Sequence, residues 1–240
     1  MSRAETVRHY LFERYPSRRF VPLALLLAGA GLLAVPGTEH LSTVAALHSG
    51  LRTSLVVYLI VLSLRVWDDL EDRERDARLH PERITVRVAS VTPLRHLQWA
   101  SAAVASVLIA TGARPATRLL VLSLLVAVLG IWYRARASLA PSSVIVAHVV
   151  LLKYPVIAYL VAPGVVRGVS GLALAAPVLM TVYVLLCIHE GLDDPELRRS
   201  RVARGVLVAE AALMLPLLGL VIVSMLEPLR VLFFGRGSMP

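Results

Sequence analysis

Acidic residues gather in two short stretches of this sequence, and such clusters could do chemistry. Of the sixteen acidic residues, seven lie between Asp68 and Glu82 and four lie between Glu190 and Glu196. Like charges at this density repel one another unless a cation lies among them. Each stretch is therefore a candidate cation site.

The first stretch places its carboxylates at helical spacing. Asp68, Asp72 and Asp76 recur at every fourth position, with Asp69 beside the first of them. A helix through this stretch therefore lines three or four carboxylates along one face. We expect Mg²⁺ as the cation, because it prefers hard oxygen ligands and is usually held by one or two carboxylates together with substrate phosphates. A diphosphate would supply the remaining ligands.

The second stretch has a shorter version of this arrangement. Glu190, Asp193 and Asp194 share a helical face at positions i, i+3 and i+4, and they could hold a second metal ion. The alternative for both stretches is a solvated face of salt bridges, which Glu71 and Arg75 fit well at i and i+4.

The composition indicates an integral membrane protein. Hydrophobic residues make up 57% of the chain, the mean hydropathy is +0.72, and the apolar residues fall into long runs. The net charge of +9 does not indicate nucleic acid, because the arginines lie mostly between apolar runs rather than on one amphipathic face. Cys187, the lone cysteine, lacks metal-site spacing and is expected to fill the core or face lipid.

Apolar segments long enough to cross a bilayer define the elements that must position these acids. A spanning helix needs about 20 mostly apolar residues. We predict an all-α transmembrane bundle of about seven helices, forming one membrane domain over residues 1–240. Residues 1–19 form a cytoplasmic or interfacial segment, and residues 227–240 form a tail. The predicted spans are 20–36, 53–67, 97–111, 116–132, 142–162, 169–189 and 205–226.

The distribution of basic residues between the loops predicts the orientation. The N-terminal segment and the loops after the second, fourth and sixth spans hold 17 basic residues, against six in the segments on the other side. Short, positively charged loops stay in the cytoplasm. We therefore expect the N-terminus and both acidic stretches to be cytoplasmic and the C-terminus to lie outside. Spans two and six both deliver acids to this face, which predicts a central cavity open to the cytoplasmic side.

Two further features have an expected role. Residues 5–20 mix arginines with aromatic and apolar residues, as an interfacial helix would, with a frayed basic tail as the alternative. Lys153, the only lysine, lies near the middle of the fifth span, where an ionisable group usually faces a cavity. It could contact a diphosphate or pair with an acid such as Glu210. Pro155 should kink this helix.

The acidic stripe resembles the first motif of the UbiA superfamily of intramembrane prenyltransferases. Asp68-Asp69-x-x-Asp72-x-x-x-Asp76 ends the second span and is followed by Arg78 and by His80-Pro81-Glu82-Arg83. Tyr133 with Arg134 and Arg136 is similar to a tyrosine and basic pair that the family places after its fourth helix. Asp68 stands where the family usually has Asn, and the third acid of the second motif would fall on Leu197. Family members commonly have nine helices, so an oligomeric partner could complete the cavity.

The resemblance implies Mg²⁺-assisted ionisation of an isoprenyl diphosphate. It implies that Asp69, Asp72 and Asp76 hold one metal ion, with Asp68 beside them. Glu190, Asp193 and Asp194 would hold the second metal ion, and Arg78, Arg83, Arg134, Arg136 and Lys153 are candidates for contact with the diphosphate.

Three functions compete on these observations. The first is a prenyltransferase that joins the prenyl group to a small or lipidic acceptor in the membrane. The second is an intramembrane terpene cyclase, in which the double bonds of the substrate capture the cation. The third is a non-catalytic transporter or assembly subunit whose acids bind cations, although most acids lie at a helix end rather than at the bilayer midplane.

Overall fold

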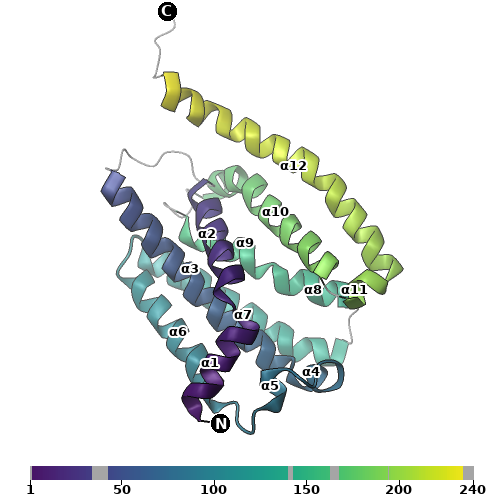
Figure 1. The fold of residues 1–240 in the computed structure, drawn as a ribbon. Helices are drawn as coiled ribbons and strands as arrows, with labels where there is room; N and C mark the ends of the chain where they lie inside the picture. The colour runs from purple at the N-terminus through teal and green to yellow at the C-terminus, as the bar shows by residue number, and fades with distance from the viewer. Residues whose placement is uncertain (1, 34–42, 140–142, 163–167, 194, 235–240) are drawn as a thin grey trace, which may run out of the picture. The chain divides into compact units, whose positions relative to one another are not determined.

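The computed structural model describes residues 2–33, 43–139, 143–162, 168–193 and 195–234. Every element of secondary structure in these ranges is a helix, in agreement with the all-α class expected from the sequence (Figure 1). The chain divides into two compact units, which are described separately. The first comprises residues 1–28 and 43–119, and the second comprises residues 29–42 and 120–240.

The first unit is built around the long helix α3. Helix α3 packs along α6, and the N-terminal helix α1 packs against both α5 and α6. Val57, Ile60 and Val61 of α3 are buried in this core. The helices are α1 (Arg3–Arg14), the start of α2 (Ser17–Leu33), α3 (Thr43–Glu71), α4 (Arg73–Leu79), α5 (Ile84–Arg87), α6 (Thr92–Ala110) and the start of α7 (Pro115–Leu139).

The second unit is organised by α10, which packs against α8, α9, α11 and α12. Close approach is visible where Gly31 of α2 meets the backbone of α9: a Cβ at this glycine would lie 2.5 Å from the carbonyl oxygen of Ala158. The remaining helices are α8 (Ser143–Leu151), α9 (Lys153–Val161), α10 (Gly168–Asp193), α11 (Pro195–Arg199) and α12 (Arg201–Phe234).

Five segments within the described residues are long and apolar enough to cross a membrane. They correspond to the second, fourth, fifth, sixth and seventh spans expected from the sequence. The first and third expected spans are helices α2 and α6. Helix α2 has 17 described residues, and α6 carries Arg95, His96 and Gln98 in its first two turns. The five segments are Leu47–Glu71, Pro115–Arg136, Val144–Val161, Ala175–Asp193 and Arg201–Val223.

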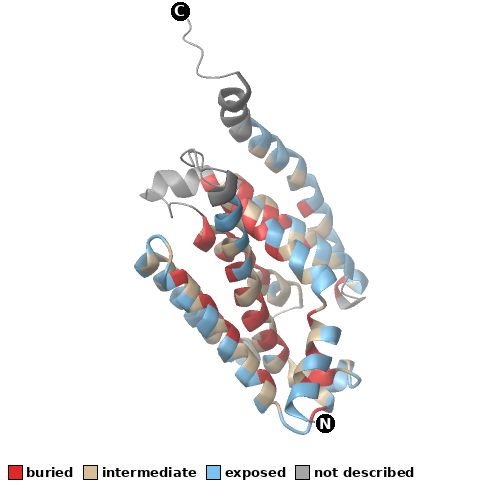
Figure 2. Cartoon of the chain, turned by 60° about the vertical axis from the view of Figure 1, so that its left-hand side comes forward, coloured by how far each residue is buried: buried red, intermediate tan, exposed pale blue. Residues whose placement is uncertain are grey.

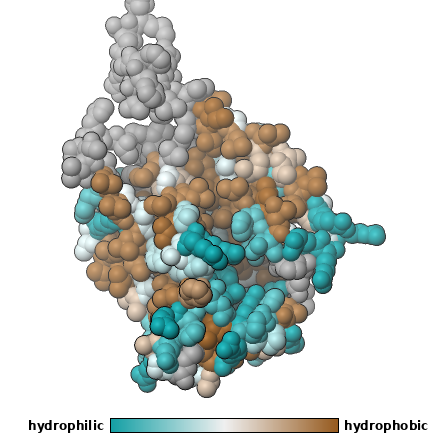
Figure 3. Space-filling view, viewed as in Figure 1, coloured by the Kyte–Doolittle hydropathy of each residue, from teal (hydrophilic) through white to brown (hydrophobic). Residues whose placement is uncertain are grey.

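Exposed apolar side chains show where these helices can meet lipid. Only 6% of the apolar window in Arg201–Val223 is buried, and Leu215 in this segment is 77% exposed. Helix α12 is accordingly mostly pale blue in Figure 2, and large brown, apolar areas cover the surface seen in Figure 3. Such surfaces are unfavourable in water, whereas a helix satisfies its own backbone hydrogen bonds in lipid. The chain is therefore suited to a bilayer.

The N-terminal segment is helical, which excludes the frayed tail. Ser2 caps α1: its hydroxyl accepts a hydrogen bond from the backbone N–H of Glu5, and the Glu5 carboxylate accepts one from the Ser2 backbone N–H. This hydrogen bond from the Ser2 backbone lowers the pKa of Glu5. Tyr10 and Tyr15 are buried while Phe12 is exposed, so one side of this segment belongs to the core of the first unit.

A break in the helix lies close to Pro155, where a kink was expected. The fifth span is divided at Leu152 into α8 and α9, three residues before the proline. Proline has no N–H to donate, and its ring clashes with the carbonyl of residue i−4, here Leu151. The interruption lies directly before Lys153, which begins α9.

Helix α6 is not among the five apolar segments, although the sequence predicts that it crosses the bilayer. Cysteine labelling on either side of the helix tests this crossing. Ala89 and Ala113 are exposed and flank α6. We expect Ala113→Cys to react with a membrane-impermeant maleimide in intact cells, and Ala89→Cys to react only after permeabilisation. The unchanged protein is the control, since Cys187 is buried. Labelling of both positions from the same side would show that α6 does not cross.

Candidate functional site

The acids of the first stretch remain in helical register in the structure. Helix α3 ends at Glu71 and α4 begins at Arg73, so Asp72 stands at the junction of the two helices. The amide of Asp72 donates to the Asp68 carbonyl at 2.9 Å, and the amide of Asp76 donates to the Asp72 carbonyl at 2.8 Å. These two i to i−4 hydrogen bonds keep the three aspartates one helical turn apart, as expected from their spacing.

Asp69 lies beside this stripe and is matched by cationic and polar groups of the first unit. Asp69 is buried and only 3% exposed. The Arg14 guanidinium contacts both carboxylate oxygens, at 2.7 and 3.2 Å, and the Tyr10 hydroxyl donates at 2.9 Å. Arg65, one turn earlier on α3, lies 3.5 Å away. In this arrangement the protein itself balances the Asp69 charge.

Tyr10 acts as a hydrogen-bond donor in this group. Burial, followed by the neighbouring Asp69 charge, raises the pKa of the Tyr10 phenol well above its ordinary value. The phenol therefore stays protonated throughout the physiological pH range, and it can donate to Asp69 without adding a second negative charge.

Helix α1 is fixed against the first unit at two further points. The Tyr15 hydroxyl, just after the helix, donates to the carbonyl of Tyr58 in α3 at 2.8 Å. The Glu13 carboxylate accepts a hydrogen bond from the backbone N–H of Ile84, the first residue of α5, at 2.9 Å. These contacts attach the N-terminal segment to α3, which carries the start of the acidic stripe, and to α5, which follows the stripe in the chain.

Asp76 is buried at the end of the stripe and is 3% exposed. Its Oδ1 atom accepts a hydrogen bond from the guanidinium of Arg83, which precedes α5. Within the part of the chain that the structure describes, its Oδ2 atom is buried without a hydrogen-bond partner. A buried carboxylate oxygen of this kind is costly unless something satisfies it, and a metal ion could do so.

The segment carrying Arg83 is held in place by Arg73. The Arg73 guanidinium donates to the carbonyl of Thr85 at 3.0 Å and to that of Val88 at 3.2 Å. Arg73 follows Asp72 directly, so one side chain joins the start of α4 to α5. The hydrogen bonds of Arg73 therefore help to hold Arg83 opposite Asp76.

The donor set of the stripe fits Mg²⁺. Asp68, Asp72 and Asp76 offer hard oxygen atoms at one-turn spacing, and Asp76 has a buried oxygen atom that no donor among the described residues satisfies. Donors from Tyr10 and Arg14 engage both oxygen atoms of Asp69, which gives this acid a role in positioning α1. The binding of a metal ion by Asp68, Asp69, Asp72 and Asp76 stays a prediction.

The second acidic stretch is only partly described. Glu190 is half-buried on α10, and Asp193 is exposed at the last residue of that helix. Asp194 lies outside the described residues. The first stretch belongs to the first unit and the second stretch to the second unit, so a site with two metal ions stays a prediction.

The predicted basic residues have different surroundings. Arg78 and Arg134 are exposed, and the Arg136 guanidinium lies 4.8 Å from the centroid of the Tyr133 ring. Lys153 is 3% exposed, with its Nζ atom 5.3 Å from the centroid of the Tyr154 ring. The Arg83 guanidinium contacts Asp76, the last acid of the stripe.

Two groupings could not be found from sequence spacing. One is the contact of Tyr10 and Arg14 with Asp69, because these residues lie more than fifty positions apart. The mixture of arginine and aromatic residues in the N-terminal segment was the only indication. The other is a cluster of His148, Cys187 and Glu210 in the second unit, on three separate helices. Glu210, expected as a possible partner of Lys153, contacts His148 at 2.6 Å.

Comparisons of this chain with protein-family models, with curated proteins and with solved structures find no match.

The network around Asp69 predicts the cost of removing Arg14. Arg14→Ala leaves a buried carboxylate with Arg65 and Tyr10 alone, and we expect a loss of about 3 kcal/mol in the free energy of unfolding, at the lower end for breaking a buried pair. Denaturant unfolding in detergent micelles, followed by circular dichroism, measures this loss.

Arg8→Ala is the matched control, because Arg8 is an exposed arginine on the same helix. Its effect should stay within about 0.5 kcal/mol. Equal effects of the two substitutions would show that the contact with Asp69 does not hold α1 in place.

Proposed function

We propose that this chain is a membrane-embedded, Mg²⁺-dependent prenyltransferase that ionises an isoprenyl diphosphate and transfers the prenyl group to a small or lipidic acceptor. The observation that carries the proposal is the stripe of Asp68, Asp72 and Asp76 at the end of the apolar segment Leu47–Glu71, with Arg83 against its last acid. The resemblance of this stretch to the first UbiA motif supports the same reaction.

The acids and the arginine have complementary tasks in this proposal. Asp68, Asp72 and Asp76 would hold Mg²⁺, which when bound neutralises charge on the leaving diphosphate. Arg83 is suited to the diphosphate as well, because a guanidinium binds phosphate oxygens with the same geometry as it binds a carboxylate. On substrate binding, Arg83 would exchange Asp76 for the diphosphate and leave both Asp76 oxygen atoms for the metal ion.

The membrane setting suits an isoprenyl substrate. Its charged diphosphate would bind at the polar end of α3. Its apolar chain would lie among apolar helices or in lipid, which keeps the apolar surface away from water. Arg78, Arg134, Arg136 and Lys153 remain candidates for the diphosphate, and Glu190, Asp193 and Asp194 for a second metal ion. We place the N-terminus and the acidic stretches on the cytoplasmic side and the C-terminus outside, as the arginine distribution favours. A second copy of the chain could complete the acceptor side of the cavity.

The proposal predicts metal-dependent diphosphate release by the purified protein. Geranyl, farnesyl and geranylgeranyl diphosphate are each supplied with Mg²⁺ or with EDTA, in the presence or absence of a membrane extract that contains acceptors. We expect release that requires Mg²⁺ and the extract, and a prenylated product in the organic phase. Release without the extract, giving a new hydrocarbon or terpene alcohol, would instead show a terpene cyclase.

Single substitutions test the assignment of the acids. Asp72→Asn and Asp76→Asn should each lower the rate of release by at least about 100-fold, because each removes a charge that holds the metal ion against the leaving group. Glu74→Gln is the matched control, since Glu74 is an exposed acid of the same helix, and its rate should be unchanged. No release under any condition by correctly folded protein, or full activity of Asp76→Asn, would contradict the proposed function.

A further inference from the structure

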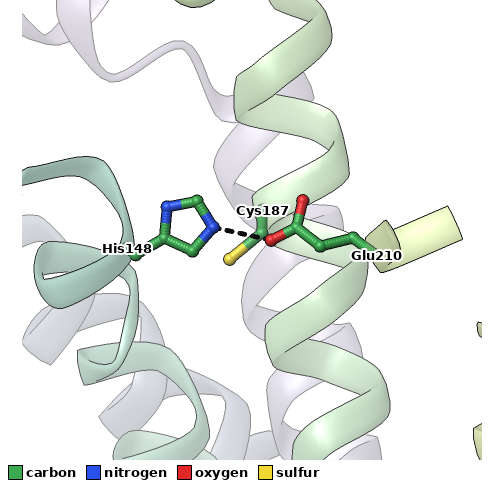
Figure 4. Close-up of side chains that lie close together, drawn as sticks. All are labelled: His148, Cys187 and Glu210. Atoms are coloured by element: carbon green, nitrogen blue, oxygen red, sulfur yellow. Dashed lines mark hydrogen bonds and ion pairs between the residues drawn. The ribbon is translucent and has the colours of Figure 1, made fainter. Parts of the chain in front are cut away.

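Three side chains with metal-binding atoms converge in the second unit, away from the acidic stripe. His148 lies on α8, Cys187 on α10 and Glu210 on α12 (Figure 4). One nitrogen, one sulfur and one oxygen atom of these residues all lie within 4.8 Å of one another. Cys187 and Glu210 are buried, and all three residues belong to apolar segments that could cross a membrane.

The contacts of His148 place either a proton or a metal ion between its ring and the Glu210 carboxylate. The Nδ1 atom of the ring lies 2.7 Å from the carbonyl oxygen of Val144, which can only accept, so Nδ1 carries a hydrogen. In the neutral ring, Nε2 is then an acceptor, and it lies 2.6 Å from Oε1 of Glu210. Two acceptors at this distance require a proton or a metal ion between them.

We propose that His148, Cys187 and Glu210 form a binding site for a divalent transition-metal ion, with Zn²⁺ as the expected occupant. Imidazole and thiolate ligands select zinc and neighbouring transition metals, whereas Mg²⁺ prefers oxygen ligands alone. Three protein ligands leave a fourth position, which is common at zinc sites that also bind water.

Charge balance favours a metal ion over separate charges at this place. A carboxylate, a thiolate and a neutral imidazole carry two negative charges together, and a divalent ion cancels them. Uncompensated charge in a membrane-spanning segment is costly, so a site with no net charge suits its surroundings. Metal ligands bind in their deprotonated forms, so binding of the ion would release protons.

The size of the cavity beside these residues indicates a single ion. Its volume is about 10 Å³, which is room for about one water molecule or one ion. Glu190, one turn beyond Cys187 on α10, lines the same cavity.

The surroundings of His148 have the features of a metal ligand. Ligating histidines almost always donate their second ring N–H to a carbonyl or carboxylate, as Nδ1 of His148 does to Val144. The Tyr183 hydroxyl of α10 donates to the backbone carbonyl of His148 at 3.2 Å and joins α8 to α10. A bound ion would tie α12 to these two helices as well.

Cobalt binding provides the test, because Cys187 is the only cysteine in the chain. The purified full-length protein is stripped of metal with a chelator and titrated with Co²⁺. With excess Mg²⁺ present to occupy the acidic stretches, we expect one Co²⁺ per chain, a sulfur-to-cobalt charge-transfer band in the near ultraviolet, and the intense visible bands of a four-coordinate ion. Zn²⁺ should displace the Co²⁺, since zinc binds such sites more tightly, and Mg²⁺ should not.

Variants locate the site and guard against adventitious binding. Cys187→Ser should abolish the charge-transfer band. His148→Gln and Glu210→Gln should each weaken Co²⁺ binding by at least about 100-fold. Substitution of a residue that contacts only the metal's ligands typically weakens binding by about 10- to 100-fold. His189→Gln is the control, because His189 is exposed on the same helix as Cys187, and its affinity should match the unchanged protein.

Two results would overturn the proposal. One is the absence of a charge-transfer band in the unchanged protein, a result that depends on no variant being folded. The other is unchanged Co²⁺ affinity in folded His148→Gln and Glu210→Gln. In either case His148 and Glu210 share a proton instead. The test uses no prenyl diphosphate, so its outcome is separate from that of the proposed function.

Discussion

The need to match every buried charge governs this structure. A carboxylate removed from water is costly unless a cation or several donors replace the lost hydration, and the cost rises further in a bilayer. Asp69 is matched by Arg14, Arg65 and Tyr10, and Asp76 by Arg83, while Glu210 lies in contact with His148. Apart from Arg65 and Asp69, which share α3, these contacts join groups from different elements. The acids therefore determine where their neighbours lie as well as what they could bind.

The matched charges also separate positioning from chemistry within one acidic stretch. Asp69 is saturated by protein donors and anchors the N-terminal helix to α3. Asp76, seven residues later, keeps one buried oxygen atom without a hydrogen bond in the described structure. In the proposed reaction this difference matters, because a metal ion with its diphosphate can exchange for a single guanidinium more readily than for three donors.

Local patterns in the sequence predicted what depends on local physics. The helical stripe of Asp68, Asp72 and Asp76 and the interruption before Pro155 follow from spacing and from the missing N–H of proline, and both are present in the structure. Tyr10 and Arg14, by contrast, meet Asp69 through tertiary packing that no spacing encodes. The same holds for Cys187, for which no metal-site spacing was visible because its companions lie on two other helices. The described structure contains five of the seven expected apolar spans, since the polar start of α6 and the described length of α2 fall short of the bilayer requirement.

The most direct measurement of the central claim is binding of an unreactive farnesyl diphosphate analogue to the purified protein, with Mn²⁺ in place of Mg²⁺ and electron paramagnetic resonance as the readout. The account predicts that the analogue and Mn²⁺ bind together, each tightening the other, and that Asp76→Asn removes this coupling. Binding of the analogue that is indifferent to the metal ion, or coupling that persists in folded Asp76→Asn, would contradict it.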